Sequence, residues 1–417
     1  MRKRLLIALI AVGLVLLGLA AAILVVTTRK PPAGKLETAL TGVSVATRTT
    51  PPPTSGPGPE GKDVDQRCWP MFGGDPQRSL SRPDIHLGIP VRRPLWVRGL
   101  KNYVEYQPSY CDGVLYVNTF KGDTWALDAT TGRIIWRRRG NGPKPSTPAI
   151  AGPYLIVSST DGTVTALARS NGRVEWQLRT NAKVESSAAV VDGVAYFGAT
   201  DGRLFAVDAA TGKIHWAYDT GGRINASPSI FGNRICITTY AGSIFCLRRS
   251  DGHKLWSTYV KRDPLRYESF YASPSTDGER LYTISRSGTV VTLSATTGDV
   301  LWKRHISSTG YTTPAIDGDR IFVAGFDGAL HAFEKKTGKE LWRANVGGRM
   351  IGAPIVVGNL VFFSSLEEKT YAARVSDGRV VWQLGIGKYS PGIATERTYY
   401  FTLNGLVVAF RGRYSPQ

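Results

Sequence analysis

Short runs of alternating or apolar residues, separated by turn signals, recur along most of the chain and predict β-strands. In one stretch, residues 154–159 and 163–168 form two such runs, and the dipeptide Asp161-Gly162 between them is a strong signal for a two-residue hairpin turn. Residues 148–151 precede this hairpin as an inner strand, and residues 173–178 follow it as an outer strand. The pattern therefore predicts a unit of four antiparallel strands.

The same unit recurs at a nearly constant spacing, marked by a tryptophan in its last strand. Successive tryptophans are separated by 40, 40, 40, 46, 40 and 40 residues, and a glycine stands four residues before each one. A small residue stands ten residues before each, which leaves room for the ring to lie across the neighbouring unit. Repeats of this length are typical of propellers with four strands in each blade. The docking tryptophans of these seven units are Trp136, Trp176, Trp216, Trp256, Trp302, Trp342 and Trp382.

An eighth blade is predicted from the two ends of the repeat region. After the seventh blade three strand-like pieces remain, at residues 391–395, 397–403 and 406–410. The fourth strand is supplied by residues 94–99, which contain one more docking tryptophan, Trp96. Pairing of the two chain ends closes the ring and removes the open edges of the sheet. The predicted fold is all-β, an eight-bladed β-propeller of four-stranded antiparallel blades closed by an N-terminal strand.

The first 26 residues have the pattern of a membrane anchor. Three cations at positions 2–4 precede residues 5–26, an uncharged run long enough as a helix to cross about 30 Å of hydrocarbon. Cations on the leading side predict a cytoplasmic N-terminus and an exported remainder. A cleavable signal peptide is the alternative, because Ala20-Ala21-Ala22 offers small residues, although its apolar core is expected to be only about 7–15 residues long. We therefore expect a transmembrane signal anchor at residues 1–26 of a single-pass cell-membrane protein.

A linker and a lead-in segment separate this anchor from the repeats. Residues 27–66 are rich in Pro, Thr, Ser and Gly and lack a periodic apolar face, which predicts a disordered linker. A flexible chain of this length has a root-mean-square reach of about 35 Å, so the propeller should be tethered near the membrane. Residues 69–78 should instead dock on the propeller and bury Trp69 and Phe72, because these side chains would be costly to leave in water. The propeller domain is expected at residues 67–411.

The repeated pattern Ala-x(4)-Thr-Gly-x-x-x-Trp, as in residues 206–216 and 332–342, resembles the tryptophan-docking repeat of the pyrroloquinoline quinone (PQQ) propeller superfamily. The lead-in at residues 69–78 is similar to the segment that opens many of its non-enzymatic members. The resemblance covers about residues 67–411 and implies the eight-bladed fold. It implies several functions, because the superfamily includes quinoprotein dehydrogenases, the BamB-type scaffold of outer-membrane assembly and sensor ectodomains.

The chemistry of the dehydrogenases is not visible in the sequence. The resemblance implies, for an enzyme, a vicinal Cys-Cys disulfide against the quinone, and carboxylate and amide ligands for calcium in the central funnel. The four cysteines of this chain are not adjacent, and no set of Asp, Glu and Asn can be placed on the calcium positions. The five histidines stand at no metal-ligand spacing. We therefore expect no catalytic residue, cofactor or metal, and keep a PQQ- and calcium-dependent oxidoreductase as the alternative.

The cysteines are candidates for two structural disulfides. Cys236 and Cys246 lie symmetrically about the turn at Ala241-Gly242, so they should face each other across a hairpin, near disulfide range. Cys68 and Cys111 could join the lead-in to the first blade. An exported chain with an even number of cysteines permits both bridges. The alternative is four buried free thiols.

The formal net charge of +20 favours attraction to an acidic or anionic partner. The connection at residues 257–273 is six residues longer than its equivalents and combines basic with aromatic side chains, as a contact surface on a rigid scaffold would. Equivalent loops should lie on the same face, around the central mouth. The alternative is that these cations only keep the surface soluble, because the opposite hairpin tips are basic as well. The predicted partner-binding residues of the mouth are Lys101, Tyr103, Lys144, Lys183, Arg223, Lys261, Arg262, Arg266, Tyr267, Phe270, Arg349 and Lys388.

The sequence thus predicts an anchored, extracytoplasmic propeller that binds or scaffolds a protein or an anionic component of the cell envelope. A sensory or lectin-like ectodomain that binds anionic wall polymers is a further alternative. Nucleic acid is not an expected partner, because the chain is exported and carries no nucleic-acid motif.

Overall fold

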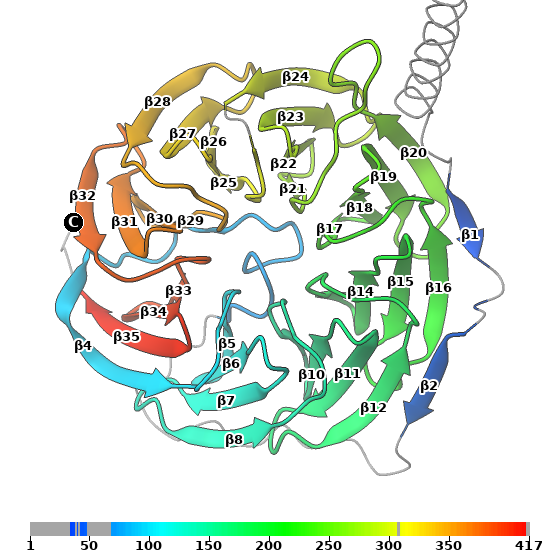
Figure 1. The fold of residues 1–417 in the computed structure, drawn as a ribbon, viewed down its shortest axis with the longest axis horizontal. Helices are drawn as coiled ribbons and strands as arrows, with labels where there is room; N and C mark the ends of the chain where they lie inside the picture. The colour runs from blue at the N-terminus through cyan, green and yellow to red at the C-terminus, as the bar shows by residue number, and fades with distance from the viewer. Residues whose placement is uncertain (1–33, 38–39, 41, 48–67, 307–308, 414–417) are drawn as a thin grey trace, which may run out of the picture.

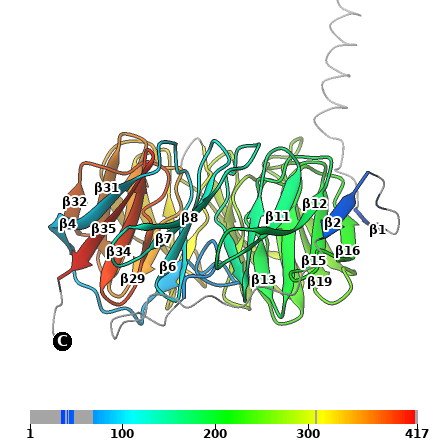
Figure 2. The same ribbon diagram turned by 90° about the horizontal axis from the view of Figure 1, so that it is seen from below.

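The computed structural model describes residues 34–37, 40, 42–47, 68–306 and 309–413, which form eight blades around a central axis. Figure 1 shows the ring of blades, and Figure 2 shows that they build a disc. In every blade the shortest strand lies next to the axis and the tryptophan-bearing strand lies at the rim (Figure 1). The predicted all-β, eight-bladed fold is confirmed.

The strands of the first four blades, each from the axis outward, are β5 (Ser109–Cys111), β6 (Val114–Asn118), β7 (Thr124–Asp128) and β8 (Ile134–Arg138); β9 (Ala149–Ala151), β10 (Tyr154–Ser158), β11 (Thr163–Ala168) and β12 (Val174–Arg179); β13 (Ala189–Val191), β14 (Val194–Gly198), β15 (Arg203–Asp208) and β16 (Ile214–Asp219); and β17 (Ser229–Phe231), β18 (Arg234–Thr238), β19 (Ser243–Arg248) and β20 (Lys254–Tyr259). Those of the last four are β21 (Ser275–Thr276), β22 (Arg280–Ile284), β23 (Thr289–Ser294) and β24 (Val300–His305); β25 (Ala315–Asp317), β26 (Arg320–Ala324), β27 (Ala329–Glu334) and β28 (Glu340–Asn345); β29 (Ile355–Val357), β30 (Leu360–Ser365), β31 (Lys369–Arg374) and β32 (Val380–Leu384); and β33 (Ile393–Ala394), β34 (Thr398–Leu403), β35 (Leu406–Gly412) and β4 (Pro90–Gly99).

The last blade joins the two ends of the propeller, as the sequence predicts. Strand β4 pairs antiparallel with β35, and Trp96 faces Ala409 in this register. The chain start therefore supplies the outer strand of the blade whose inner three strands come from the chain end (Figure 1). This closure gives the last blade the same order of four strands as the other blades of the described chain.

Seven of the eight docking tryptophans cover a glycine of the next blade. Nε1 of Trp136 donates a hydrogen bond of 2.8 Å to the carbonyl oxygen of Arg169, and a Cβ on Gly172 would lie only 2.5 Å from Cε3 of the ring. The small residue ten positions back, here Ala126, faces the same tryptophan in its own blade. The same contact joins the other blades in the pairs Trp96–Gly132, Trp176–Gly212, Trp216–Gly252, Trp256–Gly298, Trp302–Gly338 and Trp342–Gly378.

The blade junction at the ring closure is built differently. Trp382 meets the last blade, where Arg92 occupies the position that is glycine elsewhere. Its ring instead stacks on Phe401 with a centroid distance of 5.9 Å and an interplanar angle of 17°. An aromatic contact thus replaces the tryptophan–glycine contact where the repeat pattern is interrupted.

The lead-in lies at the centre of the ring, against the inner strands (Figure 1). Trp69 is fully buried and Phe72 is 8 % exposed, which confirms that this segment docks on the propeller. Inner-strand amides of six blades donate hydrogen bonds to carbonyl oxygens of the lead-in and of the two residues that follow it, Ser79 and Leu80. These amides belong to Tyr110, Ile150, Ile230, Thr276, Ile316 and Val356. Strand β3 (Ser81–Arg82) extends this pairing by lying parallel to β29.

The side chain of Arg78 links the lead-in to the inner part of the propeller. This side chain is fully buried, and its guanidinium donates hydrogen bonds to the carbonyl oxygens of Phe72, Ser187 (3.1 Å) and Pro228 (2.9 Å). Burial lowers the pKa of Arg78 to about 9, and the charge of Asp75 opposes this shift. A guanidinium suits this place because its several N–H groups can satisfy carbonyls from different directions.

Two segments of the expected linker form strands, which corrects the expectation of a wholly disordered linker. Strand β1 (Lys35–Glu37) pairs antiparallel with β16, and strand β2 (Ser44–Thr47) pairs with β12. Both cover the exposed edge of an outer strand at the rim (Figure 2). The physical reason is that the outer strand of an open blade presents unpaired N–H and C=O groups, which even a polar segment can satisfy.

Within the described ranges, no helix is long and apolar enough to cross a membrane. The expected anchor at residues 5–26 lies outside the described residues.

Candidate functional site: the mouth cavity

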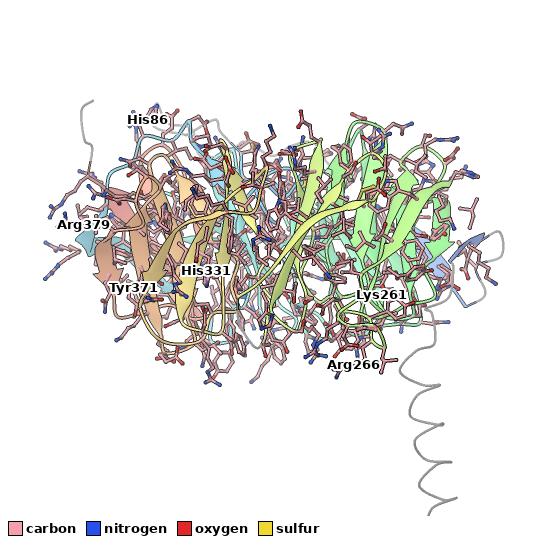
Figure 3. All side chains as sticks on the ribbon, turned by 90° about the horizontal axis from the view of Figure 1, so that it is seen from above. His86, Lys261, Arg266, His331, Tyr371 and Arg379 are labelled. Carbon is pink, nitrogen blue, oxygen red and sulfur yellow. A yellow bond between two sulfur atoms is a disulfide. The ribbon has the colours of Figure 1, made fainter. Side chains whose placement is uncertain are left out.

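The loops that connect the outer strand of one blade to the inner strand of the next lie on one face of the disc, which we call the mouth. Figure 3 shows Lys261 and Arg266, from the long connection at residues 257–273, on the face opposite to His86. The mouth encloses a cavity of about 440 Å³. A cavity of this size is large enough for a small organic ligand or a short peptide segment.

One position of the repeat recurs around the cavity wall. Six blade connections each contribute the residue that stands four positions before the first residue of the inner strand, and in five of the six a proline comes directly before that strand. Phe72 of the lead-in, Tyr106, Gln107, Phe326 and Tyr389 add to the lining. The six equivalent residues are Glu105, Glu185, Asn225, Tyr271, Tyr311 and Ile351.

Glu185 is the centre of a hydrogen-bonded group in this cavity. Its Oε2 accepts hydrogen bonds from Nδ2 of Asn225 (2.6 Å) and from the hydroxyl of Tyr271 (3.2 Å). The guanidinium of Arg223 lies 3.9 Å from its other oxygen, Oε1. Asn225 is 6 % exposed, and its Oδ1 has no hydrogen-bond partner among the described residues.

Glu105 is a second carboxylate of the cavity, and no cation or hydrogen-bond donor of the described residues balances its charge. Within the part of the chain that the structure describes, its side chain has no hydrogen-bond or ion-pair partner. Burial raises the pKa of Glu105, and the nearby charge of Glu185 raises it further. The cavity therefore concentrates negative charge in a protein whose formal net charge is +20.

A row of aromatic side chains forms another part of the cavity wall. Tyr271 and Tyr311 meet edge to face with a centroid distance of 5.5 Å, and Tyr311 packs against Phe326 at 5.7 Å. Tyr106 lies close enough to Tyr271 for a hydrogen bond between the two side chains. Burial, together with the charge of Glu185, raises the pKa of Tyr271, so its hydroxyl stays protonated.

Most of the predicted mouth residues lie on the surface of this face. Tyr103 is 59 % exposed, although several of the cations are partly neutralised by acidic neighbours. Arg266 pairs with Asp263 at 2.7 Å, and Arg349 lies 3.6 Å from Glu367. Lys388, which is half-buried, lies 3.9 Å from Glu368, and Tyr267 is also half-buried. The remaining exposed members are Lys101, Lys183, Arg223, Lys261 and Arg262.

Two of the predicted partner-binding residues are buried, and for these the expectation is corrected. Phe270 is fully buried in the core cluster around the Cys236–Cys246 hairpin, because the long connection folds back onto the blade. Lys144 is 8 % exposed, and its Nζ donates a hydrogen bond of 3.1 Å to Oγ1 of Thr124. Burial lowers the pKa of Lys144 to about 8, against the attraction of Asp123 and Asp161.

The cysteines are joined in two disulfides, Cys68 to Cys111 and Cys236 to Cys246. The first links the lead-in to β5, and the second crosses the β18–β19 hairpin, where the two residues face each other in register. Within the described ranges, the only group of three potential metal-ligand side chains is Cys68, Cys111 and Asp112. Its two sulfur atoms are bonded to each other, so this group is not a metal site.

The cavity residues do not complete the quinone and calcium site of the dehydrogenases. Calcium takes six to eight oxygen ligands. Glu105, Glu185 and Asn225 supply carboxylate and amide oxygens, but the amide of Asn225 turns its NH₂ group toward Glu185. Neither disulfide joins adjacent cysteines that could lie against a quinone. We derive no step of chemistry through these groups.

The sequence prediction missed the cavity carboxylates, although a signal for them exists. Glu185 and Asn225 stand 40 residues apart and each lies two residues after a predicted mouth cation, Lys183 and Arg223. Comparing the equivalent position in every repeat would have placed all its members around the axis.

Comparison with known proteins agrees with this architecture. The chain matches the sequence model of the family described as outer membrane protein assembly factor BamB over residues 92–304 and 242–412. These segments cover most of the chain, so it belongs to this family of propellers with PQQ-like repeats. No curated protein sequence matches the chain.

Several solved structures share the fold at low sequence identity. BamB from Moraxella catarrhalis is 20 % identical, with a TM-score of 0.54, over 78 % of this chain and 98 % of that one. A europium-containing methanol dehydrogenase is 13 % identical, with a TM-score of 0.71, and the match covers 83 % of this chain and 98 % of the dehydrogenase. The quinohemoprotein alcohol dehydrogenase of Comamonas testosteroni is 14 % identical, with a TM-score of 0.68, and the match covers 85 % of this chain and 82 % of that enzyme. At these identities the likeness shows the fold alone.

Proposed function

We propose that this protein is a membrane-anchored, extracytoplasmic propeller that binds a protein partner at its mouth and serves as a scaffold at the cell envelope. The observation that carries the proposal is the mouth cavity of about 440 Å³, bordered by exposed loops with Tyr103, Lys261 and Arg262 at their surface. A rigid ring that presents loops around a cavity is suited to holding a partner. Membership of the family described as an assembly factor supports a binding role.

The position of β1 supports a mouth that faces the membrane. Lys35, at the start of β1, pairs with Asp219, the last residue of β16 before a mouth loop. Only residues 27–33 separate the apolar run from Gly34, and seven extended residues span at most about 25 Å. If residues 5–26 cross the membrane, the mouth is held much closer to it than a free forty-residue linker would allow. A membrane-embedded or membrane-adjacent partner fits this arrangement.

The proposal is tested by photo-crosslinking of the full chain in its native membrane. A photoreactive amino acid is placed at Tyr103 or Lys261 on the mouth, and at His86 or Lys213 on the opposite face as matched controls. We expect one discrete protein adduct shared by the mouth positions and absent from the controls. Equal labelling of both faces, or no adduct at either mouth position, would contradict a protein-binding mouth.

A PQQ-dependent oxidoreductase is the second candidate, favoured by the carboxylates and amide that Glu105, Glu185 and Asn225 bring into the cavity. Titration of the full chain with PQQ and Ca²⁺, followed by quinone absorbance and dye-linked alcohol oxidation, tests it. Saturable calcium-dependent binding with turnover would establish the enzyme. The scaffold proposal expects neither.

A further inference from the structure

The mouth cavity has a chemical character that differs from the rest of the surface. The protein as a whole is strongly basic, and its exposed mouth loops carry mainly cations. The cavity that these loops surround is lined by two carboxylates, those of Glu105 and Glu185. One guanidinium, that of Arg223, lies 3.9 Å from Oε1 of Glu185. A ligand that enters the cavity therefore meets negative charge.

The carboxylates are placed to accept hydrogen bonds from a ligand. Glu105 has no partner among the described residues, and Oε1 of Glu185 has only the distant contact with Arg223. Two amides of the wall are also incompletely satisfied. Asn225 and Gln107 are 6 % and 3 % exposed, and Oδ1 of the first and Nε2 of the second have no hydrogen-bond partner in the described chain. Buried polar groups without a protein partner are available to form hydrogen bonds with a ligand or with water in the cavity.

The aromatic wall adds a second requirement. Tyr271, Tyr311 and Phe326 form a continuous row, and Tyr106 adjoins Tyr271. Aromatic faces attract cations at short range and prefer a planar, weakly hydrated group such as guanidinium. Carboxylates and aromatic rings that line one cavity are the two elements that bind an arginine side chain.

We propose that the mouth cavity binds the arginine side chain of an extended segment of the partner protein, with the guanidinium held between Glu105, Glu185 and the tyrosine wall. This inference rests on the proposed protein-binding function of the mouth. The guanidinium can form two parallel hydrogen bonds with one carboxylate, which favours arginine over lysine by geometry. A neutral side chain of the same shape lacks the charge that strengthens these bonds. The cavity is larger than one side chain, so the flanking residues of the segment also enter it.

The test uses the full chain in detergent and the capped tripeptide acetyl-Gly-Arg-Gly-amide, observed by saturation-transfer NMR and titration. The matched ligand replaces arginine by citrulline, which has nearly the same shape and no charge. We expect the citrulline peptide to bind at least tenfold more weakly. Equal binding of the two peptides, or binding of neither, overturns the proposal.

Protein variants locate the site. Glu105→Gln and Glu185→Gln should each weaken binding of the arginine peptide about tenfold, whereas Glu367→Gln, at the rim beside Arg349, should not change it. Glu105→Gln should fold normally because Glu105 has no partner to lose, and circular dichroism checks this. Unchanged binding in both cavity variants contradicts the assignment. Displacement of the peptide by millimolar Ca²⁺, with the same dependence on the two glutamates, would identify a divalent-metal site and also overturn the proposal.

The two proposals fail separately. If the mouth crosslinks a protein but the arginine peptide does not bind, the partner-binding function stands and the arginine inference is wrong. If the peptide binds through Glu105 and no protein crosslinks at the mouth, the cavity recognises cations but the scaffold function is wrong.

Discussion

The glycine four residues before each docking tryptophan gives a direct test of how neighbouring blades are joined. Gly212 has φ of +76°, and a Cβ at this position would lie 2.8 Å from Cδ2 of Trp176, closer than side-chain Cβ atoms approach other atoms. Trp176 is 1 % exposed, and its Nε1 is fixed by a 2.9 Å hydrogen bond to the carbonyl oxygen of Ala209. The ring therefore cannot move away without losing buried contacts.

The same blade contains a matched control. Gly193, in the turn between β13 and β14, has φ of +74°, and a Cβ there would meet nothing within 4 Å. Alanine at either position carries the backbone strain of the left-handed conformation, about 1–2 kcal/mol. Alanine at Gly212 also overpacks the junction with Trp176, which costs about 1–3 kcal/mol more.

The expected result is that Gly193→Ala lowers the free energy of unfolding by about 1–2 kcal/mol and Gly212→Ala by about 2–5 kcal/mol. Urea unfolding of the full chain, followed by far-ultraviolet circular dichroism, measures both, and the slopes with urea concentration should agree. In a Trp176→Ala background the extra cost of Gly212→Ala should disappear, because the ring is gone. Equal losses of unfolding free energy for the two glycine variants would refute the conclusion that Gly212 leaves the space that the ring of Trp176 occupies.

Three other outcomes are expected. Replacing both Cys68 and Cys111 by Ser should lower the free energy of unfolding by about 4 kcal/mol, since the bridge closes a loop with a separation of 43 residues, and the ten-residue hairpin bridge should matter less; thermal unfolding with and without reductant measures this. Arg78→Met should cost at least about 3 kcal/mol, because three buried carbonyl oxygens lose their donor, and a loss below 1 kcal/mol in urea unfolding would contradict this. Affinity for the arginine peptide should fall as the pH decreases through the raised pKa of Glu105, because the proton removes the charge that attracts the guanidinium; Glu105→Gln should flatten this part of the profile, and an unchanged profile would contradict the role of Glu105.

The architecture of the propeller could be predicted from the sequence because each blade repeats the same local signals. The strand β11 (Thr163–Ala168) has the predicted bounds, and β10 begins at the predicted Tyr154. Turn glycines and alternating side chains act over a few residues, so their pattern can be read along the chain. Ring closure followed from counting strands at the two ends.

The sequence prediction placed fewer features of the site correctly. It put Phe270 and Lys144 on the mouth surface, whereas the structure buries both, since whether a loop residue points outward depends on how the loop folds back. It also treated the linker as uniformly disordered, although β1 and β2 pair with the blade edges. Strand addition at an edge depends on a partner that is distant in sequence, and local composition carries no record of it.

The sequence by itself determined the number of blades, the order of their strands and the tryptophan–glycine spacing that joins them. Only the tertiary structure decided which residues meet at the axis. Glu105, Glu185 and Tyr271 are separated by 80 and 86 residues along the chain, yet the rotation from blade to blade brings them into one cavity. The physical reason is that a repeat fixes the local conformation of each position. The chemistry of the mouth depends instead on ring closure, which arranges the equivalent positions of different blades around one axis.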